Sequence, residues 1–490
     1  MKNKYLIGCL LCCLGGISSY AQPNLYSGTQ NRIVVFARFN GDPDVDTPQS
    51  QFEAMFNAEE GSLKSYFKAI SNDKLTVQSL LYPQNTGSRS FELKYCYYCY
   101  DNTWKGNYPN CKGSDITSLF DINIGFIIQD LASKLEVSES LPDASALDSD
   151  NDGCVDNFVI VFRGAGRGLG RGIYTPQTGS ITSSFTSANG EIQIKGKTVK
   201  NYTITFERNS LETHCRFMLA SLGFPVQYRN SKSLPRSVGA WDPMDGPLLS
   251  YPLVYNRMKY SNGNWIANIP AITETGVYSL SPANSAGNNA YKLVSSDPTQ
   301  FWILEYRNRS AGWEENLPES GLLIYRVNTN YTGSITANPE VYLYRKDGTP
   351  TTAGEIQNAA FSNSNGRTVF DEQSNPYAFL SNGNISDEIN ISDITFNGEQ
   401  MTFRVNKAHL NLSEIASEEW DVQVDAEQNL HVRGEGVEQV LLFNLAGQNA
   451  GVFILNGNKY LALPAHCAPG VYIAQMQGKL KNKSMKLIVR

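Results

Sequence analysis

The stretch that decides the fold is Phe158–Phe162 (FVIVF), an unbroken apolar run that comes directly after an acidic turn. A short apolar run rich in β-branched and aromatic residues predicts a strand. Residues 33–39 (IVVFARF) and 75–80 (LTVQSL) predict two more strands. Apolar residues at helical spacing predict helices in three other segments, which are residues 60–69 with Ser62 near the N-cap, residues 126–135 and residues 211–222. These elements together predict an α+β fold.

Length and composition limit the classes of protein that fit this chain. It has 490 residues, of which 41% are hydrophobic and 18% charged, enough for about two to four domains with apolar cores. This composition excludes a wholly disordered or collagen-like chain. The formal net charge of −6 provides no basic field, which argues against nucleic acid as a partner. Only the N-terminus carries a long apolar run, which excludes a polytopic membrane protein.

Residues 1–21 have the pattern of a signal peptide. A basic start, Met1–Lys4, precedes the apolar stretch Tyr5–Ile17, and small residues up to Ala21 fit cleavage after that position. A membrane anchor is one alternative, but about 13 apolar residues are too few to span a bilayer comfortably. A lipoprotein signal is another, because Leu6–Cys9 (LIGC) resembles a lipobox, yet cleavage there would leave almost no apolar region before the cysteine. We therefore expect a secreted or cell-surface protein whose mature chain has no transmembrane span.

The cysteines that remain after cleavage are even in number, which favours disulfides in an exported protein. Cys96, Cys99 and Cys111 lie close in sequence, so we expect one pair among them, with the connectivity left open. The alternative for Cys-x-x-Cys is a zinc or redox motif, but a zinc ribbon needs a second pair at similar spacing and the sequence has none.

Residues 148–156 (DSDNDGCVD) form the strongest intact chemical motif of the chain. Carboxylates at alternate positions converge on one hard cation, and the glycine permits a tight turn. The bidentate acid of an EF-hand is missing, because Val159 stands at the twelfth position. An acidic turn without an ion is the alternative, but four clustered carboxylates would then repel one another. We expect a short calcium loop whose ligands are Asp148, Asp150, Asp152, the backbone carbonyl of Cys154, and Asp156.

The end of the chain differs from the rest. Residues 426–490 consist of short alternating runs separated by Gly, Asn and Pro, which predicts a small β-sandwich, and residues 406–425 are expected to be a linker. Val440–Gln448 (VLLFNLAGQ), Pro469–Ile473 (PGVYI) and Lys486–Val489 (KLIV) resemble the C-terminal sorting domain of the type IX secretion route. That resemblance implies a bacterium of the Bacteroidetes type and the type IX secretion machinery as a partner. An ordinary accessory sandwich is the alternative.

A series of motifs extends over about residues 30–330, and their order and spacing are collectively specific. They include Gly61–Phe67 (GSLKSYF), Asp150–Gly166, Leu222–Pro225 (LGFP), Val238–Asp245 (VGAWDPMD) and Gly321–Tyr325 (GLLIY). Together they resemble the immune inhibitor A-type metallopeptidases, a family of secreted bacterial zinc endopeptidases. The resemblance implies a zincin-like metallopeptidase scaffold over residues 22–265 and a β-rich extension over residues 266–405.

In that family one helix carries His-Glu-x-x-His. The two His side chains bind zinc, the Glu activates the zinc-bound water, and a later acid completes the ligand set. The resemblance aligns these four positions with Arg216, Phe217, Ala220 and Val226, so all four are replaced. His214 is the only histidine of the peptidase-like region, and it lies two residues before the first ligand position. We therefore expect no zinc, and we expect His214 to be a surface or capping residue.

Cys215 adjoins His214 but is a poor candidate for a replacement nucleophile, because adjacent helical residues do not face one another. It belongs to an apolar stripe with Leu211, Met218, Leu219 and Leu222, which predicts core packing or a disulfide. The turn at residues 241–245 (WDPMD) resembles the one that floors the zinc site in the family, and we expect it to survive as scaffold.

Three hypotheses about function follow. The first is a catalytically inactive relative of a metallopeptidase that binds protein or peptide ligands. The second is a divergent active metalloendopeptidase that recruits other zinc ligands, which needs at least three converging groups and an open position. Its candidates are Glu212, His214, Asp242 and Asp245. The third is a surface adhesin or glycan-binding protein that uses residues 266–405, and exposed aromatic side chains there would favour it.

Overall fold

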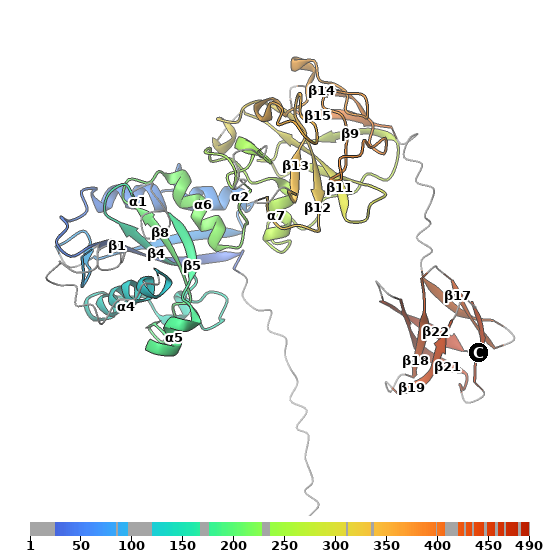
Figure 1. Cartoon of the computed structure of the whole chain (residues 1–490), viewed down its shortest axis with the longest axis horizontal. Coiled ribbons are helices and arrows are strands. Elements are labelled where there is room, and N and C mark those ends of the chain that lie inside the picture. Colours follow the sequence, from blue (N-terminus) through green and yellow to red (C-terminus); the bar gives the residue numbers. More distant parts are fainter. Residues whose placement is uncertain are drawn as a thin grey trace, which may run out of the picture. The chain divides into compact units, whose positions relative to one another are not determined.

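The structure is a computed structural model of the chain (Figure 1). It describes residues 25–84, 87–96, 120–166, 176–227, 236–309, 312–334, 338–397, 399–406, 420–425, 428–433, 436–444, 448–455, 459–464, 467–478 and 482–489. The chain divides into two compact units, one ending at Asn406 and the other following it. The expected signal peptide, Cys99, Cys111 and most of the expected linker lie outside the described residues. The predictions for these segments therefore stay predictions.

A mixed six-stranded sheet forms the centre of the first unit. Its strands are β1 (Gly28–Arg38), β2 (Leu75–Tyr82), β3 (Phe91–Glu92), β4 (Phe158–Phe162), β5 (Gln177–Ser180) and β8 (Asn201–Phe206). The order is β2-β1-β4-β8-β5, and β3 pairs with the end of β1. β1, β2, β4 and β8 run parallel, whereas β5 pairs antiparallel with β8 at one edge. The strand predicted at residues 158–162 is confirmed with those bounds, and it lies inside the sheet.

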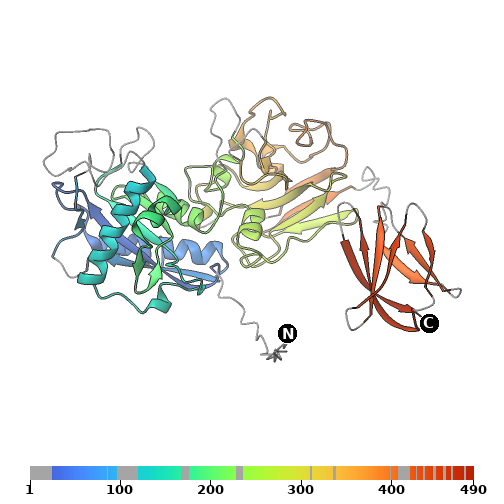
Figure 2. The same cartoon turned by 60° about the horizontal axis from the view of Figure 1, so that its bottom comes forward.

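Helices cover both faces of this sheet (Figure 1, Figure 2). One face carries α1 (Gln49–Asn57), α2 (Leu63–Ile70) and α6 (Leu211–Ser221), and the other carries α4 (Phe120–Ser138) and α5 (Ser183–Asn189). Successive side chains of a strand point to opposite faces. In β4, Val159 and Val161 join the core beneath α6, while Ile160 joins the core beneath α4. Burial on both faces explains why every position of this strand is apolar.

The start of α2 follows directly from the local sequence. Ser62 Oγ accepts a hydrogen bond from the backbone N–H of Ser65 at 3.1 Å, and Ser65 Oγ accepts one from the N–H of Ser62 at 2.9 Å. This reciprocal pair is a capping box, and the predicted N-cap at Ser62 is confirmed. The helix then buries one apolar stripe against the sheet, made of Leu63, Tyr66, Phe67 and Ile70.

Short strands and loops make up residues 266–405, as the sequence predicts. One antiparallel sheet contains, in order, β10 (Ala290–Val294), β11 (Gln300–Arg307), β12 (Gly321–Asn328) and β13 (Val341–Leu343). A second contains β14 (Ile391–Phe396), β15 (Met401–Val405) and β9 (Gly276–Leu280). The smaller elements of the unit are the hairpin β6 (Gln193–Ile194) and β7 (Lys197–Thr198), the helix α7 (Val254–Tyr260), and the 3₁₀ turns η1 (Ala144–Ala146), η2 (Gly239–Trp241), η3 (Gly312–Glu314), η4 (Ile356–Asn358) and η5 (Asn363–Asn365).

A buried ionic network joins β11 to the segment at residues 241–251. The side chain of Arg307 is fully buried, and its Nε and Nη2 donate to the two carboxylate oxygens of Glu314, each at 2.6 Å. Its Nη1 lies 3.3 Å from the carboxylate of Glu305. Nη1 and Nη2 also donate to the backbone carbonyls of Trp241 and Tyr251, each at 3.0 Å. Because a buried charge is tolerated only when it is paired in this way, the network holds the segment against β11.

The second unit contains two antiparallel sheets around one core. The first sheet contains, in order, β16 (Asp421–Val424), β17 (Asn429–Arg433) and β20 (Tyr460–Ala462). The second contains β19 (Asn449–Ile454), β18 (Gln439–Asn444), β21 (Gly470–Gln477) and β22 (Asn482–Val489). Val422 and Val432 from one sheet share the core with Leu442 and Ala474 from the other. β16 lies inside the segment expected as a linker, because Val422 turns into this core and the strand pairs with β17.

Helices and several sheets thus occur together in the chain, which confirms the predicted α+β class. Within the described ranges, no helix has both the length and the apolar character that a membrane crossing requires.

Replacing Arg307 tests the buried network. We expect Arg307→Met to lower the free energy of unfolding by about 3–5 kcal/mol, because Glu305 and Glu314 would then be buried without their cation. Urea unfolding followed by tryptophan fluorescence measures the change. Arg309→Met is the matched control, since the side chain of Arg309 is exposed just beyond β11. A loss for Arg307→Met no larger than that for the control would contradict this account.

Candidate functional site

Helix α6 carries the positions that the family resemblance assigns to zinc. It packs against β5, β8 and α2, and its buried stripe contains Cys215, Met218 and Leu219, as the sequence predicts. Cys215 is fully buried and forms no disulfide. Burial raises the pKa of its thiol well above the usual range. Since the thiolate is the reactive form of cysteine, this environment disfavours Cys215 as a nucleophile, and its burial agrees with the predicted core packing.

Arg216 stands at the first aligned zinc position and is tied to the 241–246 turn. Its Nε donates to the carbonyl of Pro243 at 2.7 Å, and its Nη2 donates to the carbonyl of Gly246. The turn is tight at this point, because a Cβ on Gly246 would lie 2.5 Å from the Cα of Ala240. A fixed guanidinium held in this way opposes the binding of a metal cation at the same place.

The remaining aligned positions offer no metal-binding atom. The side chains of Phe217 and Ala220 on α6 are half-buried, and so is that of Val226 beyond the helix. Ala220 and Val226 pack against the core beneath α6.

The alternative zinc ligands, Glu212, His214, Asp242 and Asp245, do not form a metal site, because no three of them bring ligand atoms within 4.8 Å of one another. The carboxylates of the two aspartates instead accept hydrogen bonds from backbone N–H groups. Asp242 Oδ2 accepts from the N–H of Leu253 at 2.9 Å, and Asp245 Oδ2 accepts from the N–H of Gly239 at 2.6 Å. Burial raises the pKa of both carboxyl groups.

His214 is buried, which corrects the expectation of a surface or capping residue. It is 1% exposed, and neither of its ring nitrogens has a hydrogen-bond partner in the described part of the chain. Its ring contacts Phe56 edge-on with 4.9 Å between centroids, and the guanidinium of Arg32 lies 4.6 Å from the same Phe56 centroid. Burial lowers the pKa of His214 to about 3, and the charge of Arg32 acts in the same direction. Helical periodicity could not reveal this burial, because Phe56 and Arg32 come from α1 and β1.

The acidic loop lies between η1 and β4. Asp148, Asp150 and Asp156 bring carboxylate oxygens within 4.8 Å of one another, the only such group of three that the described part of the chain contains. Asp152 is not in the group; its carboxylate accepts a hydrogen bond from the N–H of Cys154 at 2.7 Å. Gly153 has a φ of 88°, which fits the predicted tight turn. The structure thus brings together three of the four expected carboxylate ligands.

The loop carries more negative charge than its neighbours neutralise. Lys197 from β7 donates to Asp148, and this is the one ion pair that the loop makes with described residues. Burial acts to raise the pKa of Asp148, but the Lys197 contact and the N–H of Gly153, at 3.0 Å, hold that pKa below its usual value. Burial raises the pKa of Asp156 to about 6, and the charges of Asp150 and Asp148 contribute. Such mutual repulsion is what a bound cation relieves.

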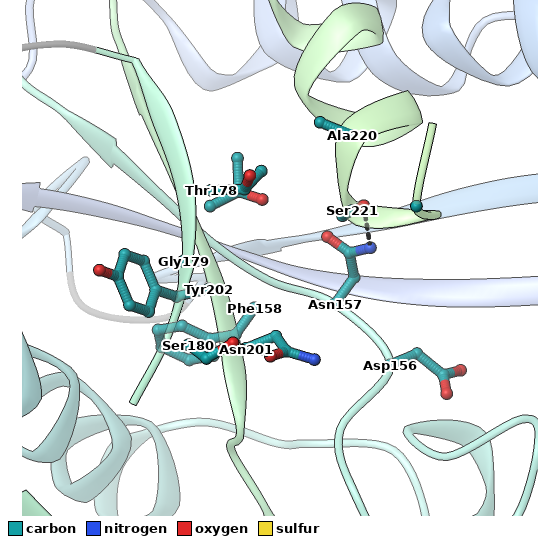
Figure 3. A pocket seen from close by; sticks show the side chains of 12 residues that line it. Asp156, Asn157, Phe158, Thr178, Gly179, Ser180, Asn201, Tyr202, Ala220 and Ser221 are labelled. Atoms are coloured by element: carbon teal, nitrogen blue, oxygen red, sulfur yellow. Dashed lines mark hydrogen bonds between the residues drawn. The ribbon is translucent and has the colours of Figure 1, made fainter. Parts of the chain in front are cut away.

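A pocket of about 220 Å³ lies between the end of α6 and the edge strand β5 (Figure 3). Its walls come from β4, β5, β8 and the C-terminal residues of α6. Ala220, the position aligned with the second zinc histidine, is part of the wall. β5 ends the sheet, so one of its edges pairs with no strand among the described residues. The pocket therefore has β5, the last strand of the described sheet, on one side and α6 on the other.

The pocket wall is mostly polar and includes one buried amide. Asn157 is 6% exposed, and its Nδ2 donates to Ser221 Oγ at 2.9 Å. Figure 3 shows the amide oxygen of Asn157 on the other side, toward Thr178. Ser180 Oγ donates to Asn201 Oδ1 at 2.7 Å. The sequence analysis missed these side chains, because single amides and hydroxyls in strands form no recognisable motif.

Comparison with known proteins identifies no family for this chain. No protein-family model matches the sequence, and no curated protein matches it.

The burial of His214 predicts a pH dependence of stability. Its pKa is about 6.5 in an unfolded chain, and burial lowers it to about 3 in the folded protein. Because the unfolded chain binds the proton more readily, the contribution of His214 is complete above about pH 6.5 and is lost as the pH falls toward 3. We expect this residue to remove up to about 1.4 kcal/mol of unfolding free energy per pH unit in that window.

His214→Leu should therefore flatten the loss of stability between about pH 6.5 and about pH 4.5. Met218→Leu is the matched control, since Met218 is buried on the same helix and leaves His214 in place, and it should keep the wild-type slope. Urea unfolding at a series of pH values measures both. Parallel losses in wild-type protein and His214→Leu would show that the imidazole does not titrate as described.

Proposed function

We propose that the chain is a secreted or cell-surface protein on a zincin-like metallopeptidase scaffold, without a peptidase's zinc centre, that binds a peptide segment in the pocket between α6 and β5. The observation that carries the proposal is the contact of Arg216 with the carbonyls of Pro243 and Gly246. The positively charged side chain of Arg216, bound to the turn, occupies the position where the family resemblance expects the first zinc ligand. The helix and the turn are thereby held together without a metal.

The form of the pocket favours an extended peptide as the ligand. An exposed strand edge accepts a peptide as an added strand, with main-chain hydrogen bonds for affinity and alternate side chains for specificity. Thr178 and Ser180 of β5 line the pocket together with Ala220 and Ser221 of α6. A peptide added along β5 would thus place every second side chain toward α6.

The other two hypotheses have less support. A divergent zinc peptidase lacks a converging ligand set among Glu212, His214, Asp242 and Asp245. A glycan-binding surface usually needs exposed aromatic rings. Between residues 266 and 405, Phe396 is the only described aromatic side chain that is exposed, at 37%.

The proposal includes export. The signal-peptide pattern of residues 1–21 and the resemblance of residues 426–490 to a type IX sorting domain support passage through the outer membrane by the type IX secretion machinery. The two sheets and common core of the second unit are compatible with such a module.

We also propose that the acidic loop binds one calcium ion through Asp148, Asp150 and Asp156. Hard oxygen ligands in a turn suit calcium. Burial raises the pKa of Asp150 and Asp156, neighbouring carboxylates add to this rise, and the ion would offset their charge. Lys197 competes for Asp148. Calcium would stiffen the entry to β4 and has no part in catalysis here.

Isothermal titration calorimetry of the chain from Gln22 onward tests the calcium site. We expect about one calcium ion per chain, and Asp150→Asn should weaken binding at least about tenfold. Asp143→Asn is the matched control, because Asp143 is exposed just before the loop and should leave binding unchanged. Lys197→Met should tighten binding by freeing Asp148. Absence of binding in wild-type protein, or equal loss in Asp150→Asn and Asp143→Asn, would contradict the site.

Two measurements on the same mature chain test the proposed function. With zinc added, hydrolysis of fluorescently labelled casein should not exceed the blank, whereas chelator-sensitive hydrolysis would favour the active-peptidase hypothesis. In the presence of a zinc chelator, the protein should still bind members of a random heptapeptide library, measured by fluorescence polarisation. Ala220→Trp should abolish that binding by filling the pocket. Ala188→Trp, on the exposed side of α5, should not.

A further inference from the structure

The pocket between α6 and β5 has the size of one side chain. Its volume of about 220 Å³ lies below the roughly 300–1,000 Å³ typical of small-molecule sites. An extended peptide on β5 would direct alternate side chains to this side of the sheet, where Thr178 and Ser180 form the wall. A single peptide side chain is therefore the group that enters it.

One buried polar atom of the pocket wall is available to accept a hydrogen bond from an incoming donor. The amide oxygen of buried Asn157 points into the space while its nitrogen is used by Ser221 (Figure 3). Thr178 adds a hydroxyl group, whereas the amide oxygen of Asn201 already accepts from Ser180 Oγ. No lysine or arginine lines the pocket, and Lys200, although next to Asn201 in sequence, is not part of the wall.

The surroundings of the pocket are electrostatically negative. Asp156 lies at one end of it (Figure 3) and makes no ion pair with described residues, and the carboxylates of Asp150 and Asp148 are its neighbours within 4.8 Å. α6 ends at Ser221 on the wall, and the C-terminal end of a helix carries partial negative charge. The negative charge of Asp156 and the C-terminal end of α6 both favour a positively charged group in the pocket.

We infer that this pocket selects a lysine or arginine side chain of the bound peptide, an inference that rests on the proposed peptide-binding function. The ammonium or guanidinium group donates to the Asn157 amide oxygen and lies in the field of Asp156 and the α6 terminus. A neutral side chain of similar length gains the packing but not the electrostatic attraction.

Positional-scanning libraries of acetylated heptapeptides test the inference. Each sub-library has one residue fixed at the centre, either Lys, Arg, Gln, Glu or Leu, and mixed residues elsewhere. Fluorescence polarisation in calcium-free buffer should show the Lys and Arg sub-libraries binding at least about fivefold more tightly than the Gln sub-library. The preference should shrink as the salt concentration rises, because screening weakens an exposed charge interaction.

Variants that change the charge at Asn201 on the pocket wall test whether the preference for Lys arises at this pocket. Asn201→Lys should reduce the Lys-over-Gln preference to about unity, and Asn201→Asp should increase it, because Asn201 is exposed on the wall. Ser187→Lys adds the same charge on exposed α5 and should leave the preference unchanged. All variants alter exposed side chains, so folding is expected to be unaffected.

The outcomes separate the two proposals. Equal binding of the Lys, Arg and Gln sub-libraries would overturn the inference and leave peptide binding standing. A Lys preference that survives Asn201→Lys would place the cation elsewhere and would also overturn it. Failure of every sub-library to bind would overturn the proposed function and this inference with it.

Discussion

The buried guanidinium of Arg307 makes contacts that hold three parts of the first unit together. It pairs with Glu314 and Glu305 and binds the carbonyls of Trp241 and Tyr251. Because every one of these groups is buried, none of them has water as an alternative partner, and the segment between Trp241 and Tyr251 is fixed against β11. That segment presents the carbonyls that bind Arg216. The position of α6, and with it one wall of the pocket, thus depends on an ionic contact made far from it in sequence.

Helix α6 carries two basic side chains with opposite surroundings. Arg216 donates to two backbone carbonyls of the turn, whereas neither ring nitrogen of buried His214 has a hydrogen-bond partner among the described residues. The first contact stabilises the helix at any pH at which guanidinium is charged. The second makes the same helix sensitive to acid, because a protonated imidazole beside buried Arg32 would have no counter-ion among the described residues. The contacts of Arg216 with the turn therefore fix the position of the helix, whereas the burial of His214 lowers the stability of the folded protein in acid.

Asp156 belongs both to the acidic loop and to the pocket wall. A cation bound in the loop would offset part of the negative field that the pocket presents, so calcium and a cationic peptide side chain are expected to act on one shared charge. Lys197 already pairs with Asp148 and offsets part of the negative charge of the loop. This sharing follows from the direct passage of the loop into β4 through Asn157, whose amide lines the pocket.

The sequence by itself determined the elements whose causes are local. The apolar run at residues 158–162, the Ser62 cap of α2, the apolar stripe of α6 and the glycine turn of the acidic loop all depend on neighbours a few positions away, and the structure contains each of them. The tertiary structure alone decided which groups meet across the chain. It placed His214 beside residues of α1 and β1, gave Asp148 a lysine partner, left Asp152 out of the group of three carboxylates, and assembled a pocket from β5 and α6. The reason is physical. Periodicity and capping act over one or two turns of chain, whereas burial, ion pairing and the pKa of a side chain depend on partners brought close only when the whole sheet has formed.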